Sequence, residues 1–520
     1  NRPAGGNGRQ PAPDQHLSNL GDSCSFVSHP EGVAQFLVPA GRYRVRAMRG
    51  LTWQPVEQEV VVEPGAVARA VLEFGSPPPE WAAAGWLAGD HHVHLFFHGR
   101  TQYPLMTIPV ACHVARAEGL DYLCFQAELA WLRRHVDKNP DFTAGDFIAE
   151  VGHEITTDFW GHVNYVNAVG VPDLPMPPAL WPANYQIRSL VDRDESMLVY
   201  THPFGGLTEA TAVSRLADPA VGLLARGLPV DVLLGQQVMV DLLSGSTADM
   251  AYKMEILARL WNLGFKFGVG GSSDAYVDQG ALLPGGFRTL VLPSARDFAA
   301  IARAYRAGRT SATNGPLLRL TVDDHPVGDT LVLDAPRTVQ VDVWAHSWWG
   351  LSALEIVHDA AVVAEIPAGP KAGPIDARLD LPIHASGWLY ARAWGPPAAD
   401  LRNVRDTARA GQLAMTSPVW LTVRDRPQPI RTDDIEFFDR WLDAVADALP
   451  GYRQRLLSSG QFGSADDLQR DVQHAQVMLH AARQALHAVG QRATGGKTTS
   501  AAAGRATATG QPSGGPCQHD

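Results

Sequence analysis

The chain contains 520 residues, of which 45% are hydrophobic and 19% are charged, a balance typical of a globular protein of about two to four domains. Its net charge of −11 and its lack of any run of Lys and Arg argue against a nucleic-acid partner, because phosphate binding needs clustered positive charge. No apolar stretch is long enough to span a bilayer, and the four cysteines form neither a disulfide framework nor a thiolate metal motif. The expected partner is a small-molecule substrate, with no nucleic acid and no membrane.

The first 77 residues are expected to hold a leader and one small module. Residues 1–30 are rich in Gly, Pro, Asn and Gln and predict a disordered leader. Because the first residue is Asn1, we expect a processed or truncated chain, and a cytoplasmic and a periplasmic or secreted location both stay open. Residues 31–77 predict a small antiparallel β module that ends in a Pro-rich linker. Its expected strands are Ala34–Val38, Tyr43–Ala47, Val56–Val62 and Val67–Phe74.

Residues 78–322 show apolar strands that alternate with helices, the pattern of βα units around a parallel sheet or barrel. Helical spacing of apolar residues is present at Ile108–Gly119, Ala248–Leu263 and Ala295–Ala307. After an opening strand at Gly89–Phe97, further strands are expected at Tyr122–Phe125, Phe147–Val151, His162–Val169, Met197–Tyr200, Val230–Leu234, Val238–Leu243, Phe265–Val269 and Phe287–Leu292.

The opening strand carries three histidines. Side chains two apart in a strand share a face, so Asp90, His92 and His94 can converge, while His91 points to the other side and is expected to be structural. Paired imidazoles suit a metal ion. Taken alone, a His-x-His pair is more often a surface or hydrogen-bonded feature.

Four later strand ends also carry polar side chains, and they favour a metal site over a surface histidine pair. Ends of parallel strands bring distant segments into one crevice. Together with the first pair, these ends supply four imidazoles and two carboxylates, a mixture that suits a divalent transition metal such as Zn, Mn or Fe. The six residues are His92, His94, Glu154, His162, His202 and Asp274.

The order of these motifs resembles the PHP (polymerase and histidinol phosphatase) metallohydrolase superfamily, and is most similar to its carbaryl-hydrolase-like CehA/McbA branch. The resemblance extends over about residues 39–423 and implies a distorted (β/α)7 barrel with metals at the carboxyl ends of the strands. The segments that indicate the branch are Leu234–Val238, Asn262–Phe265, Pro284–Thr289 and Gly308–Pro316.

The resemblance also implies how the ligands are shared. One ion would be held by His92, His94, Glu154 and Asp274; a second would share Glu154 as a bridge and add His162 and His202. Relatives with three ions need two further histidines, and the matching positions here are occupied by the segment Ala127–Leu129 and by Tyr276. One or two ions are therefore expected, and not three.

The expected chemistry is hydrolysis. A divalent ion with an open position lowers the pKa of its bound water to about 7, so hydroxide on the metal would be the nucleophile. The sequence has no Gly-x-Ser-x-Gly elbow and no cysteine beside a plausible histidine partner. Two candidate catalytic residues are also ligands: Asp274 as proton acceptor and Glu154 as the bridge. Tyr276 is a third candidate, which either donates a hydrogen bond to the substrate or packs. Arg288 is the fourth, with a structural ion pair as the alternative. Residues expected to line or orient the site are His98, Glu128, Asn164 and Asp241.

The substrate is expected to be apolar or aromatic, with a neutral carbamate, ester or amide bond. Arg and Lys are sparse near the motifs, although a phosphate product needs positive partners. Aromatic residues gather there instead, which favours an apolar pocket, and the alternative is that they belong to the core at the mouth of the barrel. These residues are Phe96, Phe97, Phe159, Trp160 and Phe204. A PHP-type phosphoesterase and a non-catalytic metal- or ligand-binding protein are the alternatives.

The remaining chain predicts two more modules and a tail. Residues 323–426 alternate in the β manner and predict a β-sandwich, whose tryptophans form either its core or a ligand-binding face. Residues 427–490 predict a helical hairpin that docks on its own chain or forms a homodimer seam. We expect its first helix to end at Pro450 and its second to begin at an N-cap, Ser464, with Asp467 at the box position. Residues 491–520 predict a disordered tail.

Overall fold

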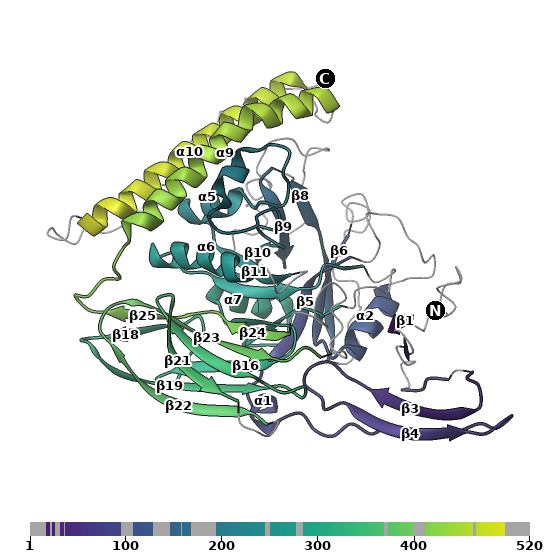
Figure 1. Ribbon diagram of the computed structural model, residues 1–520. Coiled ribbons are helices and arrows are strands. Elements are labelled where there is room, and N and C mark those ends of the chain that lie inside the picture. Colours follow the sequence, from purple (N-terminus) through teal and green to yellow (C-terminus); the bar gives the residue numbers. More distant parts are fainter. Residues whose placement is uncertain are drawn as a thin grey trace, which may run out of the picture.

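The computed structural model describes residues 17–20, 23–26, 32–35, 37–94, 108–127, 146–157, 159–167, 194–244, 250–276, 284–368, 373–398, 411–460 and 464–494. The fold is mixed α/β, as the sequence predicts. A central α/β region lies between a long helical hairpin and a β-sandwich, and a β-ribbon projects from one side (Figure 1).

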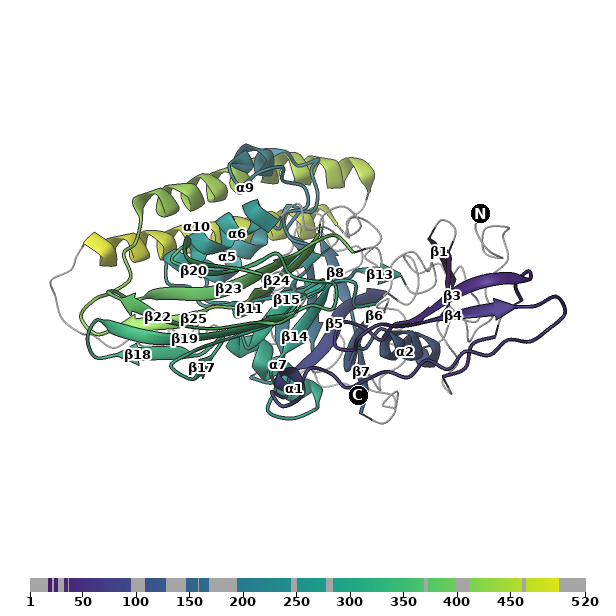
Figure 2. The ribbon, with the colours of Figure 1, turned by 60° about the horizontal axis from the view of Figure 1, so that its bottom comes forward.

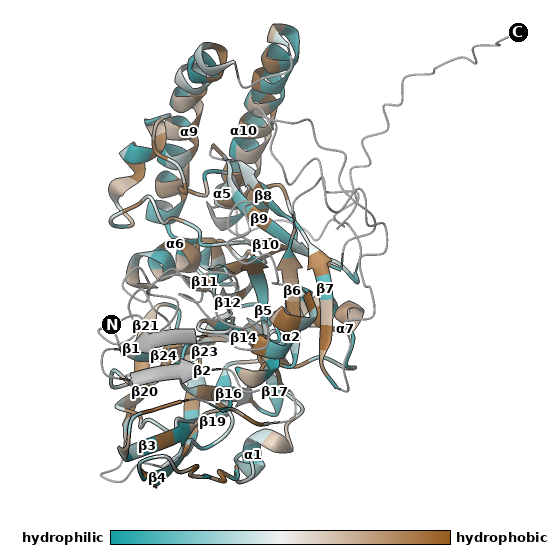
Figure 3. Cartoon of the chain, turned by 90° about the vertical axis from the view of Figure 1, so that its right-hand side faces the viewer, coloured by the Kyte–Doolittle hydropathy of each residue, from teal (hydrophilic) through white to brown (hydrophobic). Residues whose placement is uncertain are grey.

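Two sheets form the central region. In the first, three parallel strands lie side by side: β5 (Leu87–His94), β6 (Tyr122–Gln126) and β7 (Ile148–Gly152). β6 and β7 are apolar along much of their length (Figure 3), because both of their faces are covered. The second sheet runs in the order β12 (Gly268–Ser272), β11 (Val238–Ser244), β10 (Met197–Tyr200), β9 (Gly161–Val166) and β8 (Glu154–Thr157).

The strands are not all parallel, which the sequence did not predict. β10, β11 and β12 are parallel to one another, whereas β9 is antiparallel to both of its neighbours, β8 and β10. Only three residues separate Thr157 at the end of β8 from Gly161 at the start of β9, and so short a connection favours antiparallel pairing because no crossover helix is needed. Within the described strands, no backbone ladder joins the two central sheets, which contact each other through β12, β14 (Arg288–Val291) and β15 (Thr310–Thr313).

The predicted helices are present as α2 (Ile108–Ala117), α6 (Met250–Asn262) and α7 (Phe298–Ala307). One predicted strand is wrong: Val230–Leu234 lies in a helix, α5 (Gly227–Leu233). All seven residues of α5 are buried, so its apolar run has no helical period. A short apolar run of this kind fits a buried strand and a buried helix equally well.

The β-sandwich is continuous with the central region. β14 and β15 pair antiparallel with each other, and they join β5 on one side to the sandwich strand β24 (Gln412–Thr416) on the other. The same sheet contains β23 (Gly387–Gly395), β25 (Val419–Val423), β18 (Thr330–Leu333), β20 (Ala353–His358) and β21 (Ala361–Pro367). The opposing sheet contains β17 (His325–Pro326), β16 (Leu317–Val322), β19 (Arg337–His346) and β22 (Ile375–Ile383).

Two of the sandwich tryptophans are buried in cores. Trp344 is 4% exposed and stacks on Trp81 of the short helix α1 (Pro79–Ala82), whereas Trp388 is 0% exposed and packs on Trp261 of α6. α1 and α6 therefore cover the faces that these two tryptophans would otherwise offer to a ligand. Trp348, Trp349 and Trp394 are half-buried.

The N-terminal residues form two small ribbons. β3 (Gly41–Ala47) and β4 (Val56–Val62) pair antiparallel and extend away from the body (Figures 1 and 2). The segments 34–38 and 67–74 form no strand where the structure describes them, and Leu37, Val67 and Val71 are exposed. Within the predicted disordered leader, β1 (Leu17–Leu20) and β2 (Ser23–Phe26) form a hairpin. A Gly-Asp pair separates these two segments in the sequence, which is a hairpin signal that favours the pairing.

The chain ends in two long antiparallel helices, α9 (Thr432–Ser459) and α10 (Ala465–Thr494). The expected N-cap is confirmed, since Ser464 Oγ accepts from the Asp467 backbone N–H at 3.1 Å. The expected stop at Pro450 is wrong: α9 continues for nine residues beyond it, because Tyr452 packs on Phe159 and Leu456 is buried. α10 includes residues 491–494, which were predicted to belong to the tail. No helix among the described residues is long and apolar enough to cross a membrane.

Candidate metal centre

The centre begins at a bulge in β5. The pairing of β5 with β6 shifts between Asp90 and Val93, so His91 and His92 occupy the irregular position. His92 and His94 point to the same side, with their Nε2 atoms 3.1 Å apart. His91 points the other way, where its Nε2 lies 2.8 Å from Asp241 Oδ1 and its Nδ1 lies 3.1 Å from the Tyr305 hydroxyl. His91 is therefore structural, as strand alternation predicts.

Two carboxylates complete a first group of ligand atoms around this histidine pair. His92 Nε2 lies 3.4 Å from both Glu154 Oε2 and Asp274 Oδ1, and His94 Nε2 lies 3.3 Å from the same two atoms. Ligand atoms bound at about 2.0–2.1 Å in a tetrahedron are separated by about 3.3–3.4 Å. His92, His94 and Asp274 are thus spaced as ligands of one tetrahedral ion, and His92, Glu154 and His202 form a second set of atoms that could hold a metal ion.

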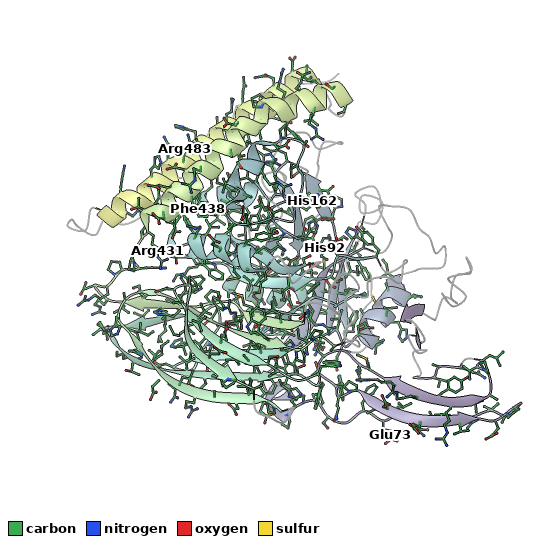
Figure 4. All side chains as sticks on the ribbon, viewed as in Figure 1. Glu73, His92, His162, Arg431, Phe438 and Arg483 are labelled. Atoms are coloured by element: carbon green, nitrogen blue, oxygen red, sulfur yellow. The ribbon has the colours of Figure 1, made fainter. Side chains whose placement is uncertain are left out.

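A second group shares Glu154. Its other oxygen, Oε1, lies 2.9 Å from His162 Nδ1 and 3.0 Å from His202 Nε2. The two histidines meet because β9 and β10 pair antiparallel, so the end of β10 lies beside the start of β9, and the Thr201 N–H donates to the His162 carbonyl. One carboxylate therefore presents one oxygen to each group. His92 and His162 lie in the interior of the molecule (Figure 4).

Two of the six ligand-type residues have strained backbones. Asp274 has a φ of 52° and His202 a φ of 30°, backbone angles that residues other than glycine rarely adopt. Such strain persists only where the surroundings enforce it, and it gathers at functional sites.

Asp90 is one of the residues that enforce this geometry. It is 0% exposed, and it accepts hydrogen bonds from the backbone N–H groups of His92, Ser273 and Gly285. It therefore fixes the segment just before Asp274 relative to β5. Asp90 lies outside both groups of ligand atoms.

Burial and nearby charges shift the pKa of three of the six side chains. Burial alone would raise the pKa of Glu154, but the charge of His92 and hydrogen bonds from His162 and His202 hold it well below its usual range. Burial would likewise raise the pKa of Asp274, and the nearby histidines lower it instead. Burial opposes the charged form of His94, yet hydrogen bonds to Asp274 and Glu154 raise its pKa to about 9. Both carboxylates are therefore ionised at neutral pH.

The buried polar atoms of the cluster also fit a cation. Asp274 Oδ1 is buried, and its contacts with His92 and His94 Nε2, at 3.4 and 3.3 Å, are too long to satisfy it fully as an acceptor. Leaving a buried acceptor unsatisfied costs about 1–3 kcal/mol. A cation between this oxygen, His92 and His94 would remove that penalty. Imidazole nitrogens with carboxylate oxygens suit Zn, Mn or Fe.

Comparison of the chain with protein families, with curated proteins and with solved structures found no match. The case for a metal centre therefore depends on the geometry of the six side chains.

Of the predicted catalytic residues, Tyr276 contacts the cluster of ligand-type side chains, whereas Arg288 contacts backbone carbonyls. Tyr276, in β13 (Ala275–Tyr276), stacks on the His94 ring with 4.9 Å between centroids and 11° between planes. Arg288 is 3% exposed and donates to the carbonyls of Gly285 and Glu118, at 2.7 and 3.0 Å. Its guanidinium therefore contacts backbone carbonyls, and its role at the site stays a prediction.

Two amide side chains support the bulge in β5. Asn164 Nδ2 and Gln126 Nε2 both donate to the His91 carbonyl, at 3.1 and 2.9 Å. Asn164 is a residue that the sequence predicts to orient the site. Gln126 is not predicted, although it stands at the end of an apolar strand as several of the ligand-type residues do. Asp241 binds His91 and Ser272 rather than a ligand histidine.

The aromatic residues that suggested an apolar substrate have another role. Phe159, Trp160 and Phe204 are 0%, 2% and 0% exposed and pack in the core beneath the helical hairpin. For these three residues the core interpretation is therefore confirmed, and they give no support to an apolar substrate. The other predicted residues at the site lie outside the described residues: Phe96, Phe97, His98 and Glu128.

Proposed function

We propose that the protein is a metal-dependent hydrolase that uses two divalent ions to cleave a carbamate, ester or amide bond of a small molecule. The observation that carries the proposal is the Glu154 carboxylate, whose two oxygens each contact a separate pair of histidines. A bridging carboxylate between two groups of nitrogen and oxygen ligands is the arrangement of two-metal hydrolytic sites.

The chain's own residues take distinct roles in this proposal. His92, His94, Glu154 and Asp274 would hold one ion, and Glu154, His162 and His202 the second. Bound divalent ions would lower the pKa of a coordinated water to about 7 and polarise the bond to be cleaved. Asp274 is the most exposed of the six, with 21% of its side chain accessible. We assign the proton-accepting role to its second oxygen, Oδ2.

Tyr276 would keep the His94 ring in place. Its ring stacks on His94, and β13 pairs in register with β5 at these two residues. This contact supports a packing role.

The charge around the cluster supports a neutral scissile bond. In the described part of the chain, no Arg or Lys forms an ion pair with Glu154 or Asp274, and the Arg288 guanidinium is directed to backbone carbonyls. A phosphoester hydrolase needs positive groups to stabilise its charged product. Carbamate, ester and amide substrates are neutral, so their binding needs no Arg or Lys beside the metal ions.

The same observations support the resemblance to PHP metallohydrolases of the carbaryl-hydrolase-like branch. The six residues matched to that family converge, although they lie as far apart in the chain as His92 and Asp274. We interpret the two central sheets as halves of a distorted barrel of the PHP type. The contacts of β12 with β14 and β15, and of β7 with β9, support this interpretation.

Metal content and a substrate panel test the proposal. Purified protein is stripped with a chelator, reloaded with Zn²⁺, Mn²⁺ or Fe²⁺, and assayed on aryl carbamates, aryl esters, anilides and aryl phosphates. We expect two ions per chain and turnover of one of the first three classes, lost with chelator and restored by metal. Hydrolysis of phosphates alone would support a phosphoesterase. Bound metal without any turnover would support a binding protein.

A further inference from the structure

We infer that the C-terminal helical hairpin positions the His162 and His202 half of the metal centre, through Trp441 of α9. The inference rests on the proposed function, since it concerns the ion held by that half. In Figure 1 the hairpin lies along the side of the central region that contains α5, β8 and β9.

The first contact joins Trp441 to the segment that carries His202. Trp441 and Phe204 are both 0% exposed, and their rings meet edge to face with 5.7 Å between centroids. Phe204 follows His202 by two residues, and both have positive φ values, 64° and 30°. Because these conformations are unfavourable for residues other than glycine, packing from outside must hold the segment in place. Trp441 supplies part of that packing.

The second contact joins Trp441 to the segment that carries His162. The indole N–H of Trp441 donates to the Arg226 carbonyl at 3.1 Å. Arg226 is fully buried and donates to three backbone carbonyls, those of Leu216, Asp218 and Phe159. Phe159 precedes His162 by three residues.

The chain around Arg226 is fitted closely to the same segment. The Gly227 N–H donates to the Trp160 carbonyl at 2.9 Å. A Cβ atom on Gly161 would lie only 2.7 Å from the Cα of Ala225, so these backbones touch. A shift of Arg226 would therefore move the residue directly before His162.

The other half of the centre is held by different groups. His92 and His94 belong to β5, and Asp274 follows β12; Asp90 and Asp241 hold those segments. The hairpin packs mainly on the 3₁₀ helix η2 (Ala212–Ala217), on α5 and on α6. Loosening the hairpin should therefore weaken the ion at His162 and His202 and leave the other ion in place.

Trp441→Phe tests this, with Trp344→Phe as the control. Trp344 is 4% exposed and stacks on Trp81 in the core of the β-sandwich, so it is a buried tryptophan with a ring contact that does not belong to the hairpin. Binding of Zn²⁺ to metal-free protein is measured by competition with a chelating dye, and melting temperatures are recorded without metal. We expect both variants to lose similar thermal stability. Only Trp441→Phe should bind one of the two ions about 10-fold or more weaker, the size typical of groups that orient ligands.

Each outcome decides something. Two ions bound by Trp441→Phe with wild-type affinity would overturn this inference alone, as would equal weakening in both variants. A wild-type protein that binds fewer than two ions would overturn the proposed function and this inference with it. If Trp441→Phe does not fold, Phe204→Leu removes the other ring of the same contact and is judged by the same titration.

Discussion

Replacing the bridging carboxylate of Glu154 should abolish the binding of both ions, whereas replacing Asp274 should abolish the binding of one. Glu154 is 8% exposed, and its oxygens lie 2.9–3.4 Å from four imidazole nitrogens. Glu154→Gln leaves a single neutral oxygen for one group, and its amide nitrogen cannot bind a cation in the other. Changes that only reorient ligands weaken metal binding about 10–100-fold. Loss of a direct ligand should therefore lower the affinity for each ion by at least about 100-fold, or about 2.7 kcal/mol.

The assay counts metal per chain after equilibration with a fixed free concentration of Zn²⁺. We expect two ions in the wild type, close to none in Glu154→Gln and one in Asp274→Asn, whose side chain contacts only the first group. Glu150→Gln is the matched control, because Glu150 is a carboxylate of similar burial (5% exposed) on the neighbouring strand β7. The Glu150→Gln variant should bind both ions. Equal metal content in Glu154→Gln and Asp274→Asn would refute the bridge.

Three further variants test the packing and charge of the C-terminal helices. Asp434→Ala should lower the free energy of unfolding in urea by about 2–3 kcal/mol, because the buried Asp434 accepts from Arg259 and Asn262 at 2.8 and 3.0 Å; an unchanged midpoint would contradict this. Pro450→Ala should raise stability by about 1–3 kcal/mol, since a proline inside a helix removes one hydrogen bond; a loss would show that the helix is built around the ring. Asp471 has its pKa raised to about 6 by burial and by Asp467, so its contribution to stability is complete below about pH 4 and is lost as the pH rises through 6. Asp471→Asn should therefore melt higher than the wild type at pH 7 by more than it does at pH 4, and a constant difference would refute the assignment.

Much of the candidate site could be predicted because its residues follow a local rule. His92, Glu154, His202 and Asp274 each stand at or just beyond the end of an apolar strand, where parallel sheets gather polar side chains. Strand alternation separated His91 from its neighbours for a similar reason, since side-chain direction in a strand is set by sequence position alone.

The features that the sequence did not predict depend on long-range packing. Nothing near Arg288 shows that its guanidinium would meet the Glu118 carbonyl, which belongs to the end of a helix 170 residues earlier. Phe204 next to a ligand looks like a pocket residue until α9 covers it. Pro450 would end an isolated helix, but contacts on both sides of it keep α9 intact.

Both central sheets contribute side chains to the candidate metal centre, so imidazoles of one sheet meet a carboxylate of the other in the interior. β5 carries His92 and His94, whereas Glu154 and His162 belong to β8 and β9 of the other sheet, and no backbone ladder joins these sheets within the described strands. The His94 imidazole faces the Glu154 carboxylate across this junction, and hydrogen bonds to Asp274 and Glu154 raise the pKa of His94 to about 9 although burial opposes its charged form. A divalent ion bound by side chains of both sheets would hold the sheets together. At 100 times its dissociation constant, such an ion would add about 2.7 kcal/mol to the free energy of unfolding.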